Sequence, residues 1–540
     1  MNFFNRAVKN VSRKLSKTIL LILTFLLVGT LVIVGLGVSN ASTQAKTLTR
    51  QKMRAVATLE VDSMAWYNYV ESIQDEDERN KAYQNYPWVT LAEVQDILKD
   101  SRVKTANAIE TLFAYPDDSG LDYVHLNNSA EENSGGGQSC YTDENGNSKC
   151  VEYTEPTYLL KTNYFPSMIE IEDGDYKISE GRFYTQEEID NASKVCLVSK
   201  AFAEHNSLKV GDTISFLTNS ASDISVMYGE DMGITSEDYT CELQIIGIFE
   251  HNSAITPDTQ GYDYLSPYQN PDNMILMPGT TYKATSVPLQ QKVFDYYKTK
   301  NPDDEYYQDE NNRPSIDNLS QVTLNSVTLL LNDPLEVDQF AADYKDKLGD
   351  YKTINVDNSE FNKLAKPLDT LTMYANFIVW LVVINAVVII TLITALTLKT
   401  REYEIGVLLS LGASKFKVVA QFFVELALVA LLGFTLSIGT GSLIADKVGQ
   451  TVLQYQIASS GLDEDDSSSN GNFYYDDVWN DNYTSDVSLE DIVSNYHVSI
   501  SPIIIAEIYI VGLVIVLISI LIPSMMIMRF NPKKILLNQN

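Results

Sequence analysis

The side chains that could carry out chemistry are few and far apart along this chain. Its histidines are His125, His205, His251 and His497, and no two of them are neighbours in the sequence. The patterns H-E-x-x-H of zinc proteases and G-x-S-x-G of serine hydrolases are both absent from the sequence. The pattern G-x-x-x-x-G-K-[ST] is absent too, so the chain has no P-loop with which to bind ATP. We therefore predict a protein that is not an enzyme, although a constellation assembled only by folding stays open.

The cysteines fall into two pairs of different character. Cys140 and Cys150 bracket a short segment that contains Asn145-Gly146, a pair typical of hairpin turns. A disulfide between Cys140 and Cys150 is the prediction if this part of the chain meets an oxidising compartment. Cys196 and Cys241 lie in or beside strand-like runs, where buried free thiols and a second bridge are both open. Neither pair has the spacing of a zinc site, and we expect no bound metal.

The segment Lys399–Lys417, KTREYEIGVLLSLGASKFK, has more pattern than a passive connection needs. Its apolar residues Ile405, Leu408, Leu409 and Leu411 recur at helical spacing, and Gly412-Ala413-Ser414 predicts a turn after them. A short amphipathic helix follows from this pattern. Such a helix either docks a partner protein or lies in the lipid interface, and its mixture of apolar and acidic groups favours docking.

Two features stand out in the apolar run that follows this segment. Glu425 is an ionisable group inside a stretch long enough to span a membrane, where such a group is normally turned inward and partnered. Small residues recur every fourth position, which permits close helix packing either across a dimer or within one chain. These helix-packing residues are Gly433, Ser437, Gly441 and Ala445.

The elements that position these residues begin with four long apolar runs. The runs are Thr18–Val38, Met373–Leu398, Val418–Ala445 and Ile503–Met528, each long enough to cross a hydrocarbon core of roughly 30 Å. A cleavable signal peptide is the alternative for the first run. That run is too long for one, and Ser39-Asn40-Ala41 is a poor cleavage site. We therefore predict four transmembrane helices.

Basic residues at the ends of these runs predict the orientation. The N-terminal tail has Arg6, Lys9, Arg13, Lys14 and Lys17 with no acid, and the C-terminal tail has Arg529, Lys533 and Lys534 with no acid. The connection 399–417 is also rich in lysine and arginine. By the positive-inside rule all three lie in the cytoplasm, which agrees with an even number of spans. The net charge of −32 argues against nucleic-acid binding. Because the three cytoplasmic pieces are basic, most of the acidic residues lie on the extracytoplasmic side.

Two regions are then extracytoplasmic, 39–372 and 446–502. The larger mixes strand-like runs, such as Thr213–Leu217 and Ser326–Leu331, with helix starts at Thr90 and at Asp333-Pro334, which predicts an α+β domain. Helical spacing from Phe361 to Leu371 predicts a stiff stalk into the second span, with a kink or restart at Pro367. The acidic run 463–469 predicts a solvated, mobile loop and lacks the spacing of a calcium loop.

The sequence at this point resembles a known family. Arg401–Ser414, followed by Phe422-Phe423-Val424-Glu425, is similar to the C-terminal module of FtsX-like ABC permeases, a group that includes MacB-type proteins and Gram-positive Vex-type exporters. Ser410 stands where that family often has alanine. Gly181-Arg182-Phe183, Leu208–Ile214 and Ile246–Phe249 resemble the MacB-like periplasmic core, and the ending around Asn531-Pro532 also fits. Segments 115–160 and 455–500 match no pattern that we associate with the family.

The resemblance implies a division of labour between two kinds of subunit. A separate ATPase would bind ATP and magnesium, dock on the cytoplasmic connection and move the outer domains of a permease dimer, while this chain binds no cofactor itself. The implied coupling residues are Arg401, Glu402, Glu404, Ile405, Gly406, Leu408, Leu409, Leu411, Gly412, Ala413 and Ser414. Export or extraction of a peptide, lipid-linked or hydrophobic substrate is one implied function. FtsX-like signalling to a cell-wall hydrolase and a receptor without an ATPase are the alternatives, and the coupling motif disfavours the receptor.

The implied protein lies in the plasma membrane of a bacterium, with both termini cytoplasmic. Its expected partners are the ATPase, a second permease, membrane lipid and an adaptor or other extracytoplasmic protein. The expected order along the chain is an amphipathic segment with the first span (1–38), a MacB-like domain with its stalk (39–372), the second span (373–398), the coupling segment (399–417), the third span (418–445), an outer loop (446–502), the fourth span (503–528) and a tail (529–540), the last six forming the FtsX-like module 373–540.

Overall fold

The computed structural model describes residues 11, 15–133, 137–142, 146–228, 232–253, 255–257, 259, 261–315, 322–459, 492–494 and 496–529. These residues divide into two compact units. The α/β unit runs from Arg54 to Asp357, and the helical unit comprises the described residues before and after it. The acidic run 463–469, Asn145 and the tail beyond Arg529 lie outside the described residues.

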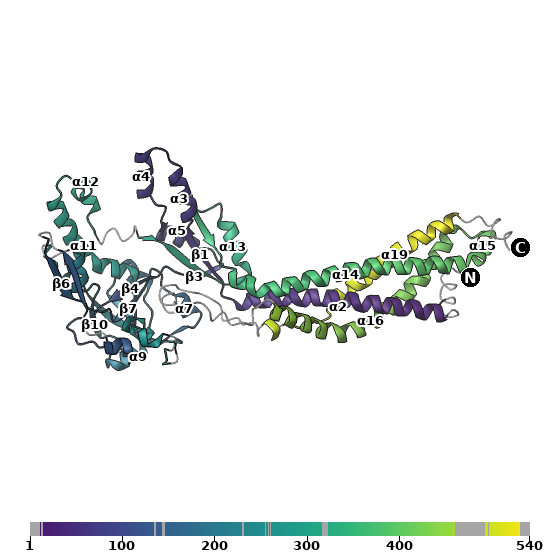
Figure 1. Ribbon diagram of the computed structural model, residues 1–540, viewed down its shortest axis with the longest axis horizontal. Coiled ribbons are helices and arrows are strands. Elements are labelled where there is room, and N and C mark those ends of the chain that lie inside the picture. The colour runs from purple at the N-terminus through teal and green to yellow at the C-terminus, as the bar shows by residue number, and fades with distance from the viewer. Residues whose placement is uncertain are drawn as a thin grey trace. The chain divides into compact units, whose positions relative to one another are not determined.

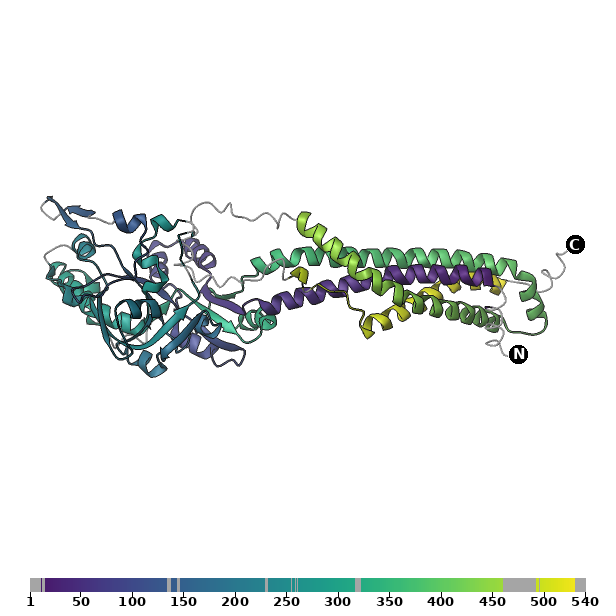
Figure 2. The same cartoon turned by 90° about the horizontal axis from the view of Figure 1, so that it is seen from below.

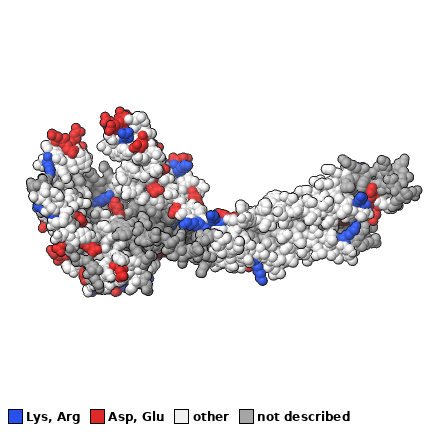
Figure 3. Space-filling model, viewed as in Figure 1, with Lys and Arg blue, Asp and Glu red and all other residues white. Residues whose placement is uncertain are grey.

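The helical unit is built from four long helices and one short one (Figure 1). They are α2 (Leu15–Lys52), α14 (Ser359–Thr400), α15 (Glu402–Ser410), α16 (Lys415–Ser459) and α19 (Pro502–Arg529). The four long helices are each apolar and long enough to cross a membrane. Figure 3 shows that the visible face of this unit is nearly free of charged side chains along its middle. The predicted four spans are therefore present among the described residues.

Three of these helices are longer than the predicted spans. The helix that contains the first span continues to Lys52, and the helix that contains the third continues to Ser459. Beyond the expected spans a second apolar core joins these extensions to α14, because Ala41, Leu368 and Leu453 all contribute to it. The predicted outer regions therefore begin as helix, and the stalk includes α2 and α16 as well as α14.

Pro367 does not restart the stalk helix, so this part of the prediction made from the sequence is wrong, while the alternative of a kink stays a prediction. Proline removes one backbone donor and normally breaks a helix interior. Here α14 continues through Pro367 without interruption. The next residue, Leu368, is buried in the core shared with α2 and α16. Packing against neighbouring helices stabilises α14 across this weak point.

The α/β unit contains two principal sheets. An antiparallel sheet has the order β15-β1-β14-β3, and a mixed sheet has the order β10-β11-β9-β12-β7-β4 with β8 also paired to β11. Two short pairs, β13-β2 and β5-β6, complete the strands that the described residues form. Strand bounds are β1 Val56–Val61, β2 Val89–Thr90, β3 Val103–Asn107, β4 Glu110–Ala114, β5 Gln138–Thr142, β6 Ser148–Glu152, β7 Tyr158–Asn163, β8 Tyr176–Gly181, β9 Val195–Ser199, β10 Thr213–Leu217, β11 Thr240–His251, β12 Met274–Pro278, β13 Thr323–Leu324, β14 Ser326–Leu331 and β15 Lys352–Asn355.

Helices pack against these sheets, and residues such as Val94, Phe202 and Phe340 add to cores built mainly from strands. Those of the α/β unit are α3 Ser63–Ser72, α4 Glu76–Gln84, α5 Leu91–Ile97, α6 Ser129–Asn133, α7 Ile169–Glu172, α8 Gln186–Asp190, α9 Lys200–His205, α10 Ala221–Tyr228, α11 Gly279–Lys300, α12 Glu305–Gln308 and α13 Val337–Tyr344. Thr90 forms the predicted capping box with Glu93 at the start of α5. The central strand β9 is buried on both faces, because Cys196 and Leu197 enter different apolar clusters. The predicted mixture of helix and sheet is confirmed.

The two units are joined by two short connections. Residues 53–55 separate α2 from β1, and residues 356–358 separate β15 from α14. The strands reached by these connections are antiparallel neighbours, with Thr58 opposite Asn355 and Val61 opposite Lys352. Arg54 is ion-paired to Asp173 and Asp175, which ties the first connection to the α/β unit. Both connections therefore end on one hydrogen-bonded strand pair.

Candidate functional site

The segment Arg401–Ser414 forms a compact helix and turn between α14 and α16. The short helix α15 ends in a pair of backbone bonds, Ala413 N–H to Leu408 C=O (3.0 Å) and Gly412 N–H to Leu409 C=O (3.1 Å). This is the Schellman arrangement, which requires a left-handed residue after the cap. Gly412 supplies it with φ of +86°. The glycine of the motif therefore ends α15 and turns the chain into α16.

One face of α15 is anchored to the helices on either side. Ile405 is buried with Leu398 of α14 and with Val418 and Phe422 of α16. Leu409 and Ala413 pack against the same cluster, and Gly406 is also buried. This arrangement fixes the orientation of α15 relative to the ends of two membrane-length helices. The start of α15 is thus packed against both helices through one apolar cluster.

The opposite face of α15 and its turn present apolar groups to the outside. Leu411 and Phe416 are each 80% exposed and Tyr403 is 51% exposed. Leu408 is half-buried between the two faces, while Glu402 is half-buried and Glu404 and Ser414 are exposed. The apolar residues that the sequence predicted to act together therefore fall into two groups. Ile405 and Leu409 pack within the chain, whereas Leu411 is exposed. Tyr403 and Phe416 were missed because they interrupt the apolar spacing, although an aromatic residue among charged neighbours is a usable signal.

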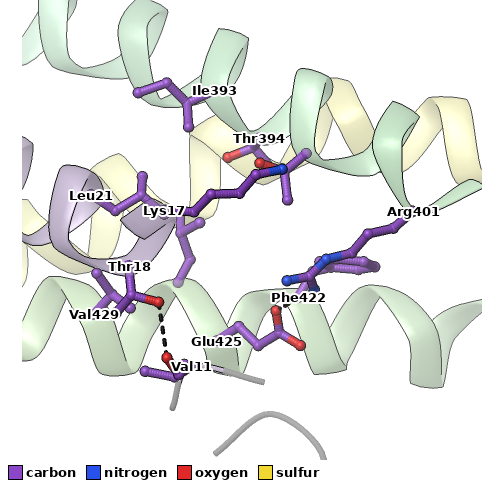
Figure 4. A pocket seen from close by; sticks show the side chains of 12 residues that line it. Val11, Lys17, Thr18, Leu21, Ile393, Thr394, Arg401, Phe422, Glu425 and Val429 are labelled. Carbon is purple, nitrogen blue, oxygen red and sulfur yellow. Dashed lines mark hydrogen bonds and ion pairs between the residues drawn. The ribbon is translucent and has the colours of Figure 1, made fainter. Parts of the chain in front are cut away.

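Arg401 and Glu425 form a buried ion pair beneath this turn (Figure 4). Arg401 Nη1 donates to Glu425 Oε2 at 2.8 Å, and only 7% and 11% of the two side chains are exposed. Gln421 donates to the other carboxylate oxygen at 3.1 Å, and the guanidinium lies over the Phe422 ring. The pair joins the start of α15 to α16. The glutamate inside the third span is thus partnered, as the sequence predicted for such a residue.

The small residues of α16 pack against α2 of the same chain. A side chain at Gly433 would meet Phe25, and one at Gly441 would meet Ile33 at 2.6 Å. Ser437 and Ala445 are fully buried, and on the facing helix Gly29 lies against Ser437. Of the two predicted uses of this ridge, packing within one chain is the one that the structure shows. The ridge is therefore not exposed for a dimer contact.

The remaining candidate residues lie in the α/β unit. Cys140 of β5 and Cys150 of β6 are joined by a disulfide, and Cys196 and Cys241 are buried free thiols. Burial raises the pKa of the Cys241 thiol to about 11. Folding brings His125 and His205 to either side of Asp122, a proximity that the sequence did not show. Among the described residues, no group of histidine, cysteine or acidic side chains has the arrangement of a metal site.

Four helices long and apolar enough to cross a membrane, together with a separate α/β unit, are the architecture of a membrane protein with a large extramembrane domain. Comparison with known families agrees. The FtsX-like permease C-terminal model matches residues 376–532, and the MacB-like periplasmic core model matches residues 18–346, which includes the segment 115–160. The chain belongs to the MacB/FtsX type of ABC transporter permeases, a family whose members carry no catalytic site of their own.

One relative matches along its whole length. It is the uncharacterized ABC transporter permease YclI of Bacillus subtilis (strain 168), 25% identical over 554 residues and covered, like this chain, to 100%. Two solved structures are also similar. The match to the periplasmic region of MacB from Actinobacillus actinomycetemcomitans covers 54% of this chain and 84% of the MacB chain (8% identity, TM-score 0.23). The match to the extracellular domain of the noncanonic ABC-type transporter YknZ from Gram-positive bacteria covers 56% of this chain and 100% of the YknZ chain (8% identity, TM-score 0.22). The family of this chain is shown by the two family models.

Proposed function

We propose that this chain couples ATP hydrolysis by a separate ATPase to movement of its α/β unit, and so exports or extracts a peptide, lipid-linked or hydrophobic substrate. ATP and magnesium are bound by the ATPase. The observation that carries the proposal is the two-faced structure of α15. One face of α15 is anchored through Ile405 to α14 and α16, whereas Tyr403 of α15, Leu411 directly after it and Phe416 at the start of α16 are exposed. An anchored helix with an exposed apolar surface suits the receipt of force from a partner.

The proposed topology places α15 and both termini in the cytoplasm of a bacterium. Support comes from Lys399, Lys415 and Lys417, which flank α15 at the ends of two candidate spans. The α/β unit then lies outside the membrane on the other side, where a disulfide such as Cys140–Cys150 persists. We propose that two permeases, identical or related, assemble with the ATPases. Their contact lies elsewhere than the α16 ridge, because that ridge is used by α2.

The docking proposal is tested by charging the exposed face of α15. Leu408→Asp together with Leu411→Asp should reduce capture of the ATPase by tagged permease at least tenfold, because apolar contacts cannot bury two carboxylates. Leu409 is left unchanged because it packs within the chain. Ser410→Asp is the matched control, since it adds a carboxylate to an exposed position on the same helix.

Capture is measured by mass spectrometry of proteins that carry Walker motifs after purification from native membranes. Equal membrane content of the three proteins shows that insertion is unaffected. Undiminished capture by the double variant would exclude the exposed face of α15 as the docking surface.

A further inference from the structure

A small cavity lies within the helical unit, between the start of α2, the end of α14 and the start of α16 (Figure 4). Its volume is about 50 Å³, which exceeds the ~15 Å³ needed for one water. Its polar lining comes from Lys17, Thr18, Thr394, Thr397, Arg401 and Glu425. Apolar side chains such as Leu21 and Phe422 form the rest of the wall. The cavity therefore has a mixed polar and apolar lining.

Two polar atoms that line this cavity are buried without a hydrogen-bond partner among the described residues. They are Thr394 Oγ1 and Arg401 Nε. Several other threonines in these helices donate to a backbone carbonyl one turn earlier, as Thr370 does to Lys366 at 2.8 Å and Thr435 to Leu431 at 2.7 Å. Thr394 and Thr391 of α14 do not, and of these two only Thr394 lines the cavity. Because buried donors are normally satisfied, Thr394 Oγ1 and Arg401 Nε predict a bound group that accepts hydrogen bonds.

The charges around the cavity indicate that this group is an anion. The positive charge of Arg401 is balanced by Glu425, to which it is bonded at 2.8 Å. The Lys17 ammonium donates to the neutral Thr400 hydroxyl at 3.3 Å, and this leaves one positive charge in excess among the ionisable groups of the lining. Lys17 also stands immediately before the uncharged run that begins at Thr18. Head groups of a bilayer lie at such a boundary between charged and apolar residues.

We propose that this cavity binds a phosphate group, whose oxygens accept hydrogen bonds from Arg401 Nε, Thr394 Oγ and the Lys17 ammonium. Phosphate offers several acceptor oxygens and a negative charge, and charge-assisted bonds to it are strong. An anionic phospholipid supplies such a group with an apolar tail, which suits the mixed lining. A free phosphate ion supplies the same oxygens without the tail. The site goes beyond ATPase coupling and does not depend on it.

The test uses the full chain, delipidated in detergent, and native mass spectrometry. The binding variant is Lys17→Gln with Thr394→Val, which removes the positive charge of Lys17 and the hydroxyl of Thr394 and leaves the Arg401–Glu425 pair intact. Thr391→Val is the matched control, because Thr391 Oγ1 is likewise buried without a partner but does not line the cavity. Lys399→Gln is the control for charge, since it removes a lysine near the same end of α14. Each protein is titrated with phosphatidylglycerol, phosphatidylcholine and inorganic phosphate.

The wild-type chain and both control variants should each bind phosphatidylglycerol at least tenfold more tightly than the binding variant does. Inorganic phosphate is expected to compete with phosphatidylglycerol if the site also accepts a soluble ion. Competition that depends on Lys17 and Thr394 in the same way would support the phosphate site and assign it to the soluble ion. Binding of both ligands that is equal in the wild type and the variant, or absent from the wild type, would overturn the proposal. Thr394→Val alone, which preserves the side-chain shape, is used if the double variant does not fold.

Discussion

At the scale of single residues, the clearest result concerns Arg401 and Glu425. Each would be costly alone in an apolar setting, and the structure places them 2.8 Å apart with Gln421 as a third partner. The pair links the start of α15 to α16, so it can serve stability, coupling or both. Separate measurements of unfolding and of ATPase coupling distinguish these roles.

Glu425→Leu should destabilise the helical unit by about 3–5 kcal/mol, because it leaves the Arg401 guanidinium buried without its counter-charge. Adding Arg401→Met should restore most of that loss, since two apolar side chains replace the pair. Thermal unfolding in detergent measures both effects. A double variant as unstable as the single one would contradict the assignment. A stable double variant in which ATP no longer moves the α/β unit would assign the pair to coupling.

A second pair at this scale predicts how the α/β unit responds to acid. Hydrogen bonds from Arg102 lower the pKa of the Asp100 carboxyl to about 2, and Arg102 also bonds Asp343 at 2.7 Å. A carboxyl with a depressed pKa stabilises the fold above its unfolded pKa of ~3.9, and this stabilisation is lost as the pH falls toward 2.

Asp100→Asn should therefore cost on the order of 1 kcal/mol at neutral pH, after allowance for solvent screening, and cost progressively less between pH 4 and pH 2. Urea unfolding of the full chain, followed by tyrosine and tryptophan fluorescence, measures the difference. Asp96→Asn, at a highly exposed i,i+3 pair with Lys99, is the control that should have little effect at any pH. A constant difference across this pH range would exclude Asp100 as the titrating group.

At the scale of elements, the important feature is the continuity of the helices with one strand pair. The short connections 53–55 and 356–358 join α2 and α14 to the neighbouring strands β1 and β15. The two helices also share a core that includes Ala41 and Leu371. Because both ends of the α/β unit are attached through short segments, we expect displacement of the helices to reach the sheet.

Insertion of Gly-Ser-Gly-Ser after Lys52 and after Asn355 should abolish ATP-dependent movement of the α/β unit and leave ATPase binding unchanged, because flexible linkers absorb displacement. The same insertion in the turn 301–304, between α11 and α12, is the control. Distances between spin labels on the α/β units of two permeases report movement. Full movement with both linkers lengthened would show that force takes another route.

At the scale of the whole molecule, the orientation in the membrane is directly testable. In a background without native cysteines, Lys300→Cys should react with an impermeant thiol reagent in intact cells, because α11 belongs to the α/β unit. Lys415→Cys, at the start of α16, should react only after permeabilisation. Labelling of position 415 from outside would reverse the topology and remove the basis for cytoplasmic docking.

The proposed coupling between the ATPase and the α/β unit makes one further prediction at this scale. ATP binding to a hydrolysis-deficient ATPase should change the distance between the two α/β units before any hydrolysis. A shift of the population from 1:99 to 99:1 requires about 5.5 kcal/mol of differential binding. Electron spin resonance of labelled permease, with and without ATP, measures the distance distribution. Identical distributions with ATP bound would leave the chain a passive anchor.

Several features followed from the sequence because local chemistry determines them. The length of an apolar run limits a spanning helix, so the four spans were found. Gly412 takes a positive φ after a helical run, so the turn at the end of α15 was predicted. Strand alternation gave β10 and β14 at their observed bounds. The MacB-like and FtsX-like character followed from short motifs and is confirmed by both family models.

Other features depended on which surfaces meet in three dimensions. A ridge of small residues looks the same whether it packs within one chain or between two, and only contact with Gly29 and Phe25 of α2 assigned it. Pro367 lies in an unbroken helix because neighbouring helices pack beside it. The division of α15 into an anchored and an exposed face, and the cavity with its two unsatisfied donors, likewise required the positions of α14 and α16. Sequence periodicity determines that a face is apolar, but the identity of its partner is decided by tertiary packing.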